Sequence, residues 1–440
     1  MSISDGTRLD PSIFRIDASR MRKGWYSDHY FNNIVLILSE LVRREYRFRG
    51  ESQILRERDF DLSRIDTGNI EVEMQYFTKR EPFSIVAGTD NAIAILKECT
   101  GYFDEHGEFV NTFKDLEVEA VQDGAKLLPW LPAMRIRGRY RDFAILETPT
   151  LGAIARRTRI ATNVYTTVKA ANGKPVLFFP ARFDIHEAQA GDGYAYRIAI
   201  ERYNMEEKKK VQPFISTAAQ GDWWGEKGGG TTAHAFILCF LGDTGEAMMA
   251  FSEALHPDVK RIALVDTNND NVGDSKKTAI KMFQKYITLK EEGRREEAKK
   301  YILYGVRADT ASNIRDVSVE PSGNPALDFG VNPRLINKMR GALDELHADP
   351  AIKPGWKEEA KRYFRSIKIV ASGGFTPEKI SLFESLRVPV DIYGVGSYLM
   401  RGENNDFTAD VVMVRINGKW CQMAKVGRQR LENPDLERVE

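Results

Sequence analysis

Two aspartates in the second half of the chain stand where catalytic side chains often lie. Asp266 and Asp309 each follow a short apolar run and directly precede a threonine. Carboxylates in such places can hold ribose hydroxyls, a histidine or the hydration shell of Mg²⁺. Aspartate and threonine are also good helix N-caps, so each residue taken alone fits either interpretation.

Two arginines, Arg182 and Arg307, stand at matching ends of apolar runs. A guanidinium fork can grip a carboxylate or a phosphate through two hydrogen bonds. A surface ion pair explains either arginine equally well when it is considered alone.

Glycines follow two further runs, as Gly373-Gly374 and Gly394-Val395-Gly396, and helical sequence comes next. Glycine lets backbone N–H groups approach an anion, and the positive end of the next helix adds to the attraction. Tight strand-to-helix turns also need glycine for steric reasons. On two successive strands, the pair of turns favours a phosphate-binding cradle.

A single histidine, His234, follows the glycine- and threonine-rich residues 229–233 and precedes an apolar helix. A lone histidine is more often structural than catalytic. The glycine-rich loop before His234 is flexible and suited to binding an anion, which favours a functional role. A structural role and a functional role therefore fit this histidine equally well.

The elements that position these residues are short apolar runs separated by helical segments. Six such runs end in polar or glycine-rich clusters: residues 176–179, 211–215, 262–265, 304–306, 367–370 and 390–393. This pattern indicates parallel strands with both faces covered, which present ligand groups at their carboxyl ends. The sequence therefore predicts an α/β fold containing an irregular β/α barrel with its site on one rim.

The two ends of the chain predict a second domain. Residues 31–42 repeat apolar side chains at helical spacing, and residues 70–77 alternate as in a half-buried strand. Residues 409–416 alternate again, and Asn417-Gly418 then gives a strong hairpin signal.

The terminal strands need a partner sheet, and the N-terminal strands can supply it. We therefore expect a smaller α+β domain formed by residues 1–130 with 405–440. The β/α barrel then occupies residues 131–404.

Composition excludes several classes of protein. The 440 residues carry a net charge of +1, which argues against nucleic acid as the main partner. No apolar stretch is long enough to span a membrane, and the polar N-terminus shows no secretory signal. Cys99, Cys239 and Cys421 lie far apart, so neither a disulfide framework nor a zinc site is expected. A cytoplasmic location fits these features.

The chain resembles the nicotinate phosphoribosyltransferases, which have the type II phosphoribosyltransferase fold, and among them the shorter archaeal-like members. The resemblance extends from residue 27 to the final hairpin. The motifs that carry it occur in family order: Leu146-Glu147-Thr148-Pro149, Ala161-Thr162, Ala181-Arg182, the Gly-Thr-x-Ala-His box ending at His234, Leu264-Val265-Asp266-Thr267, Val306-Arg307-Ala308-Asp309-Thr310, Ser372-Gly373-Gly374 and Gly394-Val395-Gly396.

The resemblance implies that nicotinate attacks C1 of phosphoribosyl pyrophosphate, giving nicotinate mononucleotide and pyrophosphate with the help of Mg²⁺. It implies that ATP is a co-substrate, hydrolysed through phosphorylation of His234, which Asp266 would orient.

The implied substrate-binding residues complete the expected site. Asp309 and Arg307 would hold the ribose and phosphates, and the turns containing Gly373, Gly374, Gly394 and Gly396 would hold the 5′-phosphate. Arg182 would pair with the pyridine carboxylate, near Ser216 and Thr217. Tyr30 would stack on the pyridine ring from a neighbouring subunit, which implies a homodimer with shared sites.

Three other activities compete with this one. A nicotinamide phosphoribosyltransferase would carry an acidic residue near the pyridine amide, where this chain has Ala218. A quinolinate phosphoribosyltransferase would have a more basic pocket and would lack the histidine box. A phosphate-binding barrel lyase or isomerase would need no phosphohistidine.

Overall fold

The computed structural model describes residues 6–55 and 60–440. The chain divides into two compact units. Unit 1 consists of Met1–Thr162, Ala195–Arg202 and Gly402–Glu440, and unit 2 of Asn163–Tyr194 and Tyr203–Arg401.

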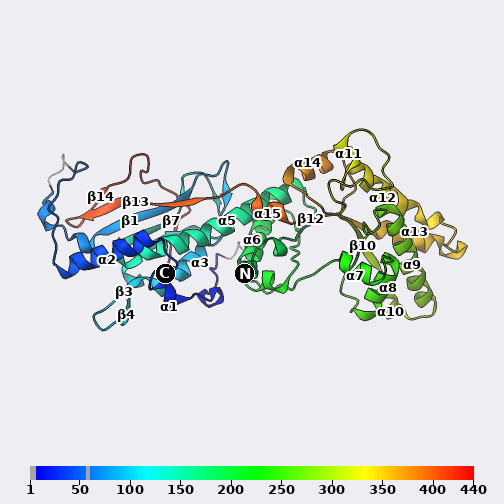
Figure 1. Cartoon of the computed structure of the whole chain (residues 1–440), viewed down its shortest axis with the longest axis horizontal. Helices are drawn as coiled ribbons and strands as arrows, with labels where there is room; N and C mark the ends of the chain where they lie inside the picture. The colour runs from blue at the N-terminus through cyan, green and yellow to red at the C-terminus, as the bar shows by residue number, and fades with distance from the viewer. Residues whose placement is uncertain (1–5, 56–59) are drawn as a thin grey trace. The chain divides into compact units, whose positions relative to one another are not determined.

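Unit 1 is built on a six-stranded antiparallel sheet to which both ends of the chain contribute, in the order β14-β13-β1-β7-β5-β15. The strands are β1 (Glu71–Thr78), β5 (Glu117–Ala120), β7 (Pro132–Arg139), β13 (Phe407–Ile416), β14 (Lys419–Gln422) and β15 (Glu437–Arg438). Figure 1 shows β13 beside β1. The predicted pairing of C-terminal with N-terminal strands is therefore confirmed.

The predicted border at residue 130 falls just before β7. Because β7 pairs along its length with β1, the compact unit that contains β1 continues beyond that border to Thr162. Two small pairs complete the strands of unit 1: β2 (Ser84–Ile85) with β6 (Lys126–Leu127), and β3 (Gly101–Phe103) with β4 (Phe109–Asn111).

Helices cover the apolar face of this sheet. Those of unit 1 are α1 (Ala18–Met21), α2 (His29–Arg43), α3 (Thr89–Cys99), α4 (Tyr140–Phe143) and the first part of α5 (Glu147–Ala170). The core joins Met74 and Ile136 of the sheet to Phe31, Leu96 and Ile154 of the helices. The helix predicted over residues 31–42 corresponds to α2, and the predicted hairpin corresponds to β13 and β14.

The expectation of a half-buried strand at residues 70–77 is wrong for β1. Glu73 and Gln75 on its polar face are 0% and 2% exposed. The chain following β14 covers them, since Arg430 pairs with Glu73, and Leu431 N–H donates to the side chain of Gln75. The carboxylate of Glu73 is buried because arginines satisfy it.

Unit 2 contains a five-stranded parallel sheet in the order β8-β12-β11-β10-β9. Its strands are β8 (Val176–Phe178), β9 (Arg261–Leu264), β10 (Leu303–Ala308), β11 (Lys368–Ala371) and β12 (Ile392–Val395). Five of the six predicted runs are therefore strands. The sixth, at residues 211–215, is reduced to one bridge between Ile215 and Phe178. Pro213 within it has no N–H to donate to a ladder.

Residues 229–232 close this sheet into an irregular ring. The N–H of Gly229 donates to the carbonyl of Ile215 at 2.8 Å, and the N–H of Thr232 donates to that of Ile262 at 3.2 Å. The first of these partners lies beside β8 and the second within β9. Unit 2 is thus an irregular β/α barrel, and His234 follows its closing segment.

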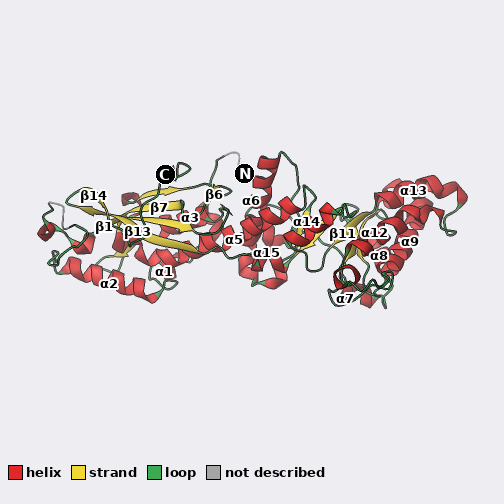
Figure 2. Cartoon of the chain, turned by 90° about the horizontal axis from the view of Figure 1, so that it is seen from above, coloured by secondary structure: helices red, strands yellow, loops and turns green. Residues whose placement is uncertain are grey.

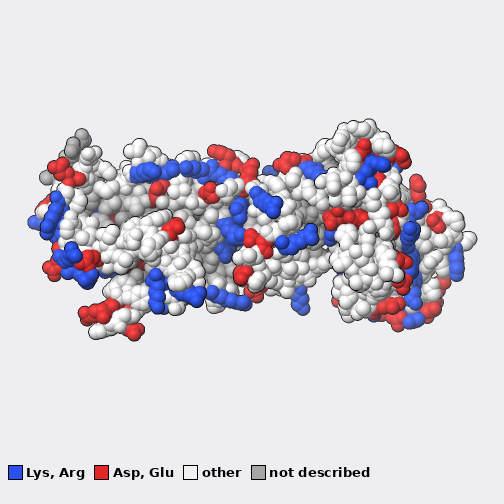
Figure 3. All heavy atoms as spheres, viewed as in Figure 1, with Lys and Arg blue, Asp and Glu red and all other residues white. Residues whose placement is uncertain are grey.

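Helices surround the ring, and α8, α9 and α12 pack against β9, β10 and β11 respectively (Figure 2). The helices of unit 2 are α7 (His234–Cys239), α8 (Thr244–Ala254), α9 (Asn271–Glu291), α10 (Arg295–Lys299), α11 (Pro325–Asp328), α12 (Pro333–Glu345), α13 (Lys357–Ser366), α14 (Pro377–Ser385) and α15 (Ser397–Arg401). The helix α6 (Gln189–Glu207) is divided, since its residues 195–202 belong to unit 1. No helix in the described part of the chain could cross a membrane. Acidic and basic side chains are interspersed on the face seen in Figure 3.

Candidate functional site

The carboxyl ends of the parallel strands in unit 2 meet at one rim of the ring, because parallel strands point the same way. The structure brings these predicted residues to that rim: His234, Asp266, Arg307, Asp309, Gly373, Gly374, Gly394 and Gly396.

His234 begins α7, and its imidazole is held at both edges. Nδ1 lies 3.2 Å from Oγ1 of Thr267, and Nε2 lies 3.5 Å from Oδ1 of Asp266. In the neutral ring, a proton on Nε2 would face the carboxylate and leave the lone pair of Nδ1 to accept from the threonine hydroxyl. The side chain remains 45% exposed, so a ligand can reach it.

Asp266 does not cap the helix that follows it. Asp270 caps α9, where its carboxylate accepts from the N–H of Gly273. Burial raises the pKa of Asp266, the imidazole of His234 lowers it, and the carboxylate of Asp309 raises it again.

One oxygen of Asp266 is not satisfied. Oδ1 is buried, and although Nε2 of His234 lies 3.5 Å away, no group in the described residues forms a hydrogen bond with it. A buried carboxylate oxygen without a hydrogen bond costs free energy. The position can therefore accept a donor or a cation that arrives with a ligand.

Asp309 is held by groups from two neighbouring strands. Nη2 of Arg307 donates to its Oδ2 at 2.9 Å, and Oγ of Ser372 donates to its Oδ1 at 2.7 Å. Capping does not explain Asp309, because the next helix, α11, begins only at Pro325.

Arg307 is tied on two sides. In addition to Asp309, its Nη1 donates to Oγ1 of Thr231 at 2.5 Å, and its guanidinium lies 5.5 Å from the ring of Phe179. The ion pair with Asp309 lies within the rim and is partly buried, with 16% of the arginine side chain exposed. This pair fixes the fork of Arg307 at the same rim as His234.

The turn after β11 contains two glycines in the left-handed region. Gly373 has φ +92° and Gly374 has φ +66°, conformations that other residues rarely adopt. No acceptor in the described residues binds the N–H of either glycine. Free N–H groups at a strand end are the feature that an anion requires.

Gly394 lies within β12 and Gly396 directly follows it, and both have a steric explanation as well. A Cβ on Gly394 would lie 3.0 Å from Cε2 of Phe179, and one on Gly396 would lie 2.6 Å from Cε2 of Phe183. Close packing therefore accounts for Gly394. At Gly396 the neighbouring ring is exposed and could move, and the backbone N–H has no acceptor among the described residues.

Four predicted residues stand outside this network of hydrogen bonds. Arg182 is exposed, forms no ion pair within the described chain, and has its guanidinium 5.4 Å from the ring of Phe183. Ser216 and Thr217 bond instead to glutamines: the hydroxyl of Ser216 donates to Gln220, and that of Thr217 to Gln189.

Tyr30 belongs to unit 1. It lies on α2 and is 57% exposed. Its hydroxyl donates to Asp28 at 3.3 Å.

Comparison with known proteins gives this geometry a family context. The sequence model described as the N-terminal domain of quinolinate phosphoribosyl transferase matches residues 59–158. Nicotinate phosphoribosyltransferase 1 of Arabidopsis thaliana is 32% identical over 305 residues, which cover 65% of this chain and 51% of that protein. Nicotinate phosphoribosyltransferase 2 of the same plant is 24% identical over 343 residues, covering 71% and 56%. The chain thus spans about half the length of these relatives.

A relative from Mycobacterium tuberculosis, nicotinate phosphoribosyltransferase pncB1, is 22% identical over 360 residues, covering 71% of this chain and 76% of that protein. The chain is thus similar to nicotinate phosphoribosyltransferases over 65–71% of its length.

Two solved structures share the fold of this chain. The nicotinate-nucleotide pyrophosphorylase of Pyrococcus furiosus superposes with a TM-score of 0.61 at 24% identity, covering 96% of this chain and 85% of that one. Human nicotinic acid phosphoribosyltransferase gives a TM-score of 0.52 at 15% identity, covering 79% and 71%.

Three further residues lie at the rim that the sequence does not mark as candidates for the site: Phe179, Thr231 and Thr267. Thr231 and Thr267 contact Arg307 and His234, and Phe179 lies beneath the guanidinium of Arg307. The two threonines fall inside motifs that were recognised. Phe179 ends an apolar run and carries no polar signal.

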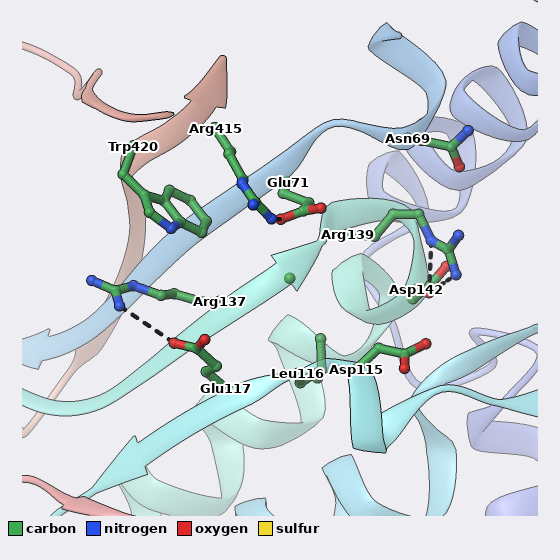
Figure 4. Close-up of a pocket in the computed structure, with 11 residues that line it drawn as sticks. Asn69, Glu71, Asp115, Leu116, Glu117, Arg137, Arg139, Asp142, Arg415 and Trp420 are labelled. Atoms are coloured by element: carbon green, nitrogen blue, oxygen red, sulfur yellow. Dashed lines mark hydrogen bonds and ion pairs between the residues drawn. The ribbon is translucent and has the colours of Figure 1, made fainter. Parts of the chain in front are cut away.

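A separate pocket of about 450 Å³ lies in unit 1 on the charged face of the sheet (Figure 4). Its arginines point toward carboxylates and pair with them: Arg137 with Glu117, Arg139 with Asp142, and Arg415 with Glu71. Because each guanidinium is already neutralised, the pocket is a poor place for a phosphate. The glycine turns whose N–H groups have no acceptor in the described residues belong to unit 2.

Proposed function

We propose that this protein transfers the phosphoribosyl group of phosphoribosyl pyrophosphate to nicotinate, as part of NAD salvage. One observation carries the proposal. In a chain similar to nicotinate phosphoribosyltransferases, a buried acid, an exposed histidine, a fixed arginine and glycine turns with free N–H groups converge on one rim of a closed ring.

In this reaction the pyridine nitrogen of nicotinate forms a bond to C1 of the ribose. The bond from C1 to pyrophosphate breaks, and its electron pair leaves with the pyrophosphate. C1 becomes cationic as this happens, so the site needs fixed groups for the anions on both sides. Asp309 and Arg307 hold the ribose and phosphates, and the turn at Gly373 and Gly374 holds the 5′-phosphate.

Arg182 faces solvent and would become ordered when it pairs with the carboxylate of nicotinate, near Ser216 and Thr217. A guanidinium that forms no ion pair within the described chain is available for this carboxylate.

Mg²⁺ fits the acids at this rim. The described residues contain no group of three or more metal-ligating side chains, but Mg²⁺ bound with substrate phosphates needs only one or two carboxylates. Asp266, with its unsatisfied oxygen, and Asp309 would hold it. The ion would supply positive charge to the departing pyrophosphate.

ATP would be the co-substrate. An imidazole nitrogen of His234 would attack the γ-phosphorus, the bond to ADP would break, and water would later release the phosphate. The contacts to Asp266 and Thr267 support this role, because they orient the exposed imidazole.

A panel assay tests the transfer. The purified protein is mixed with phosphoribosyl pyrophosphate and Mg²⁺, with nicotinate, nicotinamide or quinolinate in turn, with and without ATP, and mononucleotide formation is followed. Turnover of nicotinate is expected. Turnover of nicotinamide or quinolinate without nicotinate would contradict the proposal.

Quinolinate is the second candidate, because the matched family model is named for it. Its conversion would release CO₂ together with the mononucleotide. Measuring CO₂ in the same assay therefore separates the two acids.

Labelled ATP tests the histidine. Acid-labile label should appear on the wild-type protein and be lost from His234→Ala. The matched control is His256→Ala, since His256 is also an exposed histidine beside an aspartate, 3.2 Å from Asp258. Equal labelling of His234→Ala and wild type would show that the phosphate is carried elsewhere.

We also propose a cytoplasmic homodimer in which Tyr30 completes the partner's site. The exposed apolar side chains of Leu36 and Ile37, 68% and 58% exposed on the same helix as Tyr30, support a covered surface there. If sites are shared, mixing inactive Tyr30→Ala with inactive His234→Ala regenerates one intact site per mixed dimer. Activity that stays absent after subunit exchange would refute sharing.

A further inference from the structure

Lys379 lies in the first turn of α14, directly after the turn formed by Gly373 and Gly374. Its Nζ donates to the carbonyl oxygen of Gly373 at 3.3 Å. The rings of Phe375 and Phe383 lie 4.4 and 6.0 Å from the same nitrogen. No carboxylate of the described chain pairs with this ammonium group.

The placement is electrostatically unfavourable. Burial lowers the pKa of Lys379, and no charged neighbour offsets that effect. The first turn of a helix is also its positive end, which disfavours a cation. The rings of Phe375 and Phe383 and the carbonyl of Gly373 are the groups that attract the ammonium group here.

The geometry of the peptide bond between Gly373 and Gly374 shows what the hydrogen bond from Lys379 does to the turn. A trans peptide is planar, and its C=O and N–H point in opposite directions. Since Lys379 binds the carbonyl of Gly373, the N–H of Gly374 must point away from Lys379. A Cβ placed on Gly374 would meet no atom within 4 Å, so the space beside its Cα is open, and its N–H has no acceptor in the described residues.

We propose that Lys379 is a positioning residue that holds the Gly373–Gly374 peptide with its N–H turned outward, where it binds the phosphate of the phosphoribosyl donor. The proposal rests on the proposed function, which makes that phosphate the ligand of this turn. The ammonium group also polarises the peptide it binds, which strengthens the N–H of Gly374 as a donor to an anion.

Two substitutions separate positioning from a structural role. Lys379→Met keeps an unbranched stem between Phe375 and Phe383 but removes the donor. Lys379→Arg keeps the charge and the donor. The control is Lys357→Met, which changes an exposed lysine in the first turn of α13.

Binding of phosphoribosyl pyrophosphate and of ribose 5-phosphate is measured by calorimetry without turnover, and KM values are measured in the assay. Lys379→Met should weaken both ligands about tenfold, the usual effect of losing one charge-assisted hydrogen bond. KM for nicotinate should change by less than about twofold, and Lys379→Arg should restore most of the lost affinity.

The pH profile gives a second readout that does not depend on the methionine variant folding. Wild-type affinity for ribose 5-phosphate should fall at high pH, as the ammonium group with the lowered pKa loses its proton. Lys379→Arg should keep its affinity there. The acid beside this turn is Asp309, whose Oδ1 would lie 3.5 Å from a Cβ on Gly373.

The outcomes distinguish this inference from the proposed function. Full affinity in Lys379→Met, or identical pH profiles of wild type and Lys379→Arg, overturns the inference while leaving the activity intact. If no pyridine is converted but ribose 5-phosphate binds in a Lys379-dependent way, the inference stands and the proposed function fails. If the wild type binds neither phosphate ligand, both are overturned.

Discussion

Ser372 and Asp309 are joined by a hydrogen bond of 2.7 Å between Oγ and Oδ1, which ties the end of β11 to the end of β10. The other oxygen of the same carboxylate accepts from Arg307. Asp309 is thus the point at which two strand ends and the arginine fork are fixed relative to one another.

Asp309→Asn removes the charge that holds Arg307 and should lower kcat/KM for phosphoribosyl pyrophosphate about 100-fold. Ser372→Ala removes one hydrogen bond and should lower it about threefold to tenfold. Steady-state kinetics check both variants. The control Asp344→Asn breaks a comparable pair with Arg340 away from the rim, and it should leave kcat/KM unchanged. Similar losses in Asp309→Asn and Asp344→Asn would contradict a special role for Asp309.

Asp266→Asn should make the protein more stable near neutral pH while lowering its activity. Burial raises the pKa of Asp266 above 3.8, so above pH 3.8 the unfolded state loses this proton before the folded state does. The contribution of this group to the free energy of unfolding therefore decreases as pH rises from about 3.8 to the raised pKa. The asparagine variant has no proton to lose at this position, so its stability does not decrease in this way. Melting temperatures from pH 4 to pH 8 test this. A variant less stable than wild type at pH 8 would refute the assignment of burial as the dominant effect.

Glu147, the first residue of α5, should make the stability of unit 1 depend on pH. Burial first, and then the charges of Asp410 and Asp28, raise the pKa of Glu147 from 4.5 to about 8. Between these values the folded state keeps a proton that the unfolded state has lost, so stability falls as pH rises. Glu147→Gln should melt higher than wild type at pH 9 and at nearly the same temperature at pH 4. Calorimetry from pH 4 to pH 9 measures both melting temperatures. If the difference between wild type and Glu147→Gln stayed the same at every pH, the prediction would be wrong.

Arg430→Met should destabilise the protein by about 3 kcal/mol, because it removes one partner of the fully buried carboxylate of Glu73. Arg137 remains as a second partner, which keeps the loss at the lower end of what breaking a buried pair costs. Denaturant unfolding measures the change. The matched control, Lys299→Met, breaks the exposed pair with Glu296 and should cost less than about 1 kcal/mol.

The strands of unit 2 were predictable because buried parallel strands are continuous apolar runs, and their polar ends share one rim. The run at residues 211–215 was overestimated because apolar character says nothing of the N–H that Pro213 lacks. The alternation in β1 predicts a half-buried strand, because its partners, Arg430 and Leu431, lie more than 350 residues away and leave no mark on the local pattern.

Some residues at the rim could likewise be predicted from the sequence, and others could not. Asp266, Asp309 and His234 were found because their types and positions within motifs suggest chemistry. The contacts of Thr231, Phe179 and Lys379 join segments that are distant in sequence or have no periodic signal. Their partners could be known only from the folded chain.

The pairing of β1 with β13 has a consequence for the order of folding during synthesis. The five strands of the unit 2 ring have all been made once Val395 has left the ribosome. One edge of β1 was made more than 300 residues before its partner β13, and it stays unpaired until that strand emerges. An open strand edge invites wrong partners. Unit 1, whose first strands are translated early, can therefore complete its sheet only after the strands of unit 2 have been made.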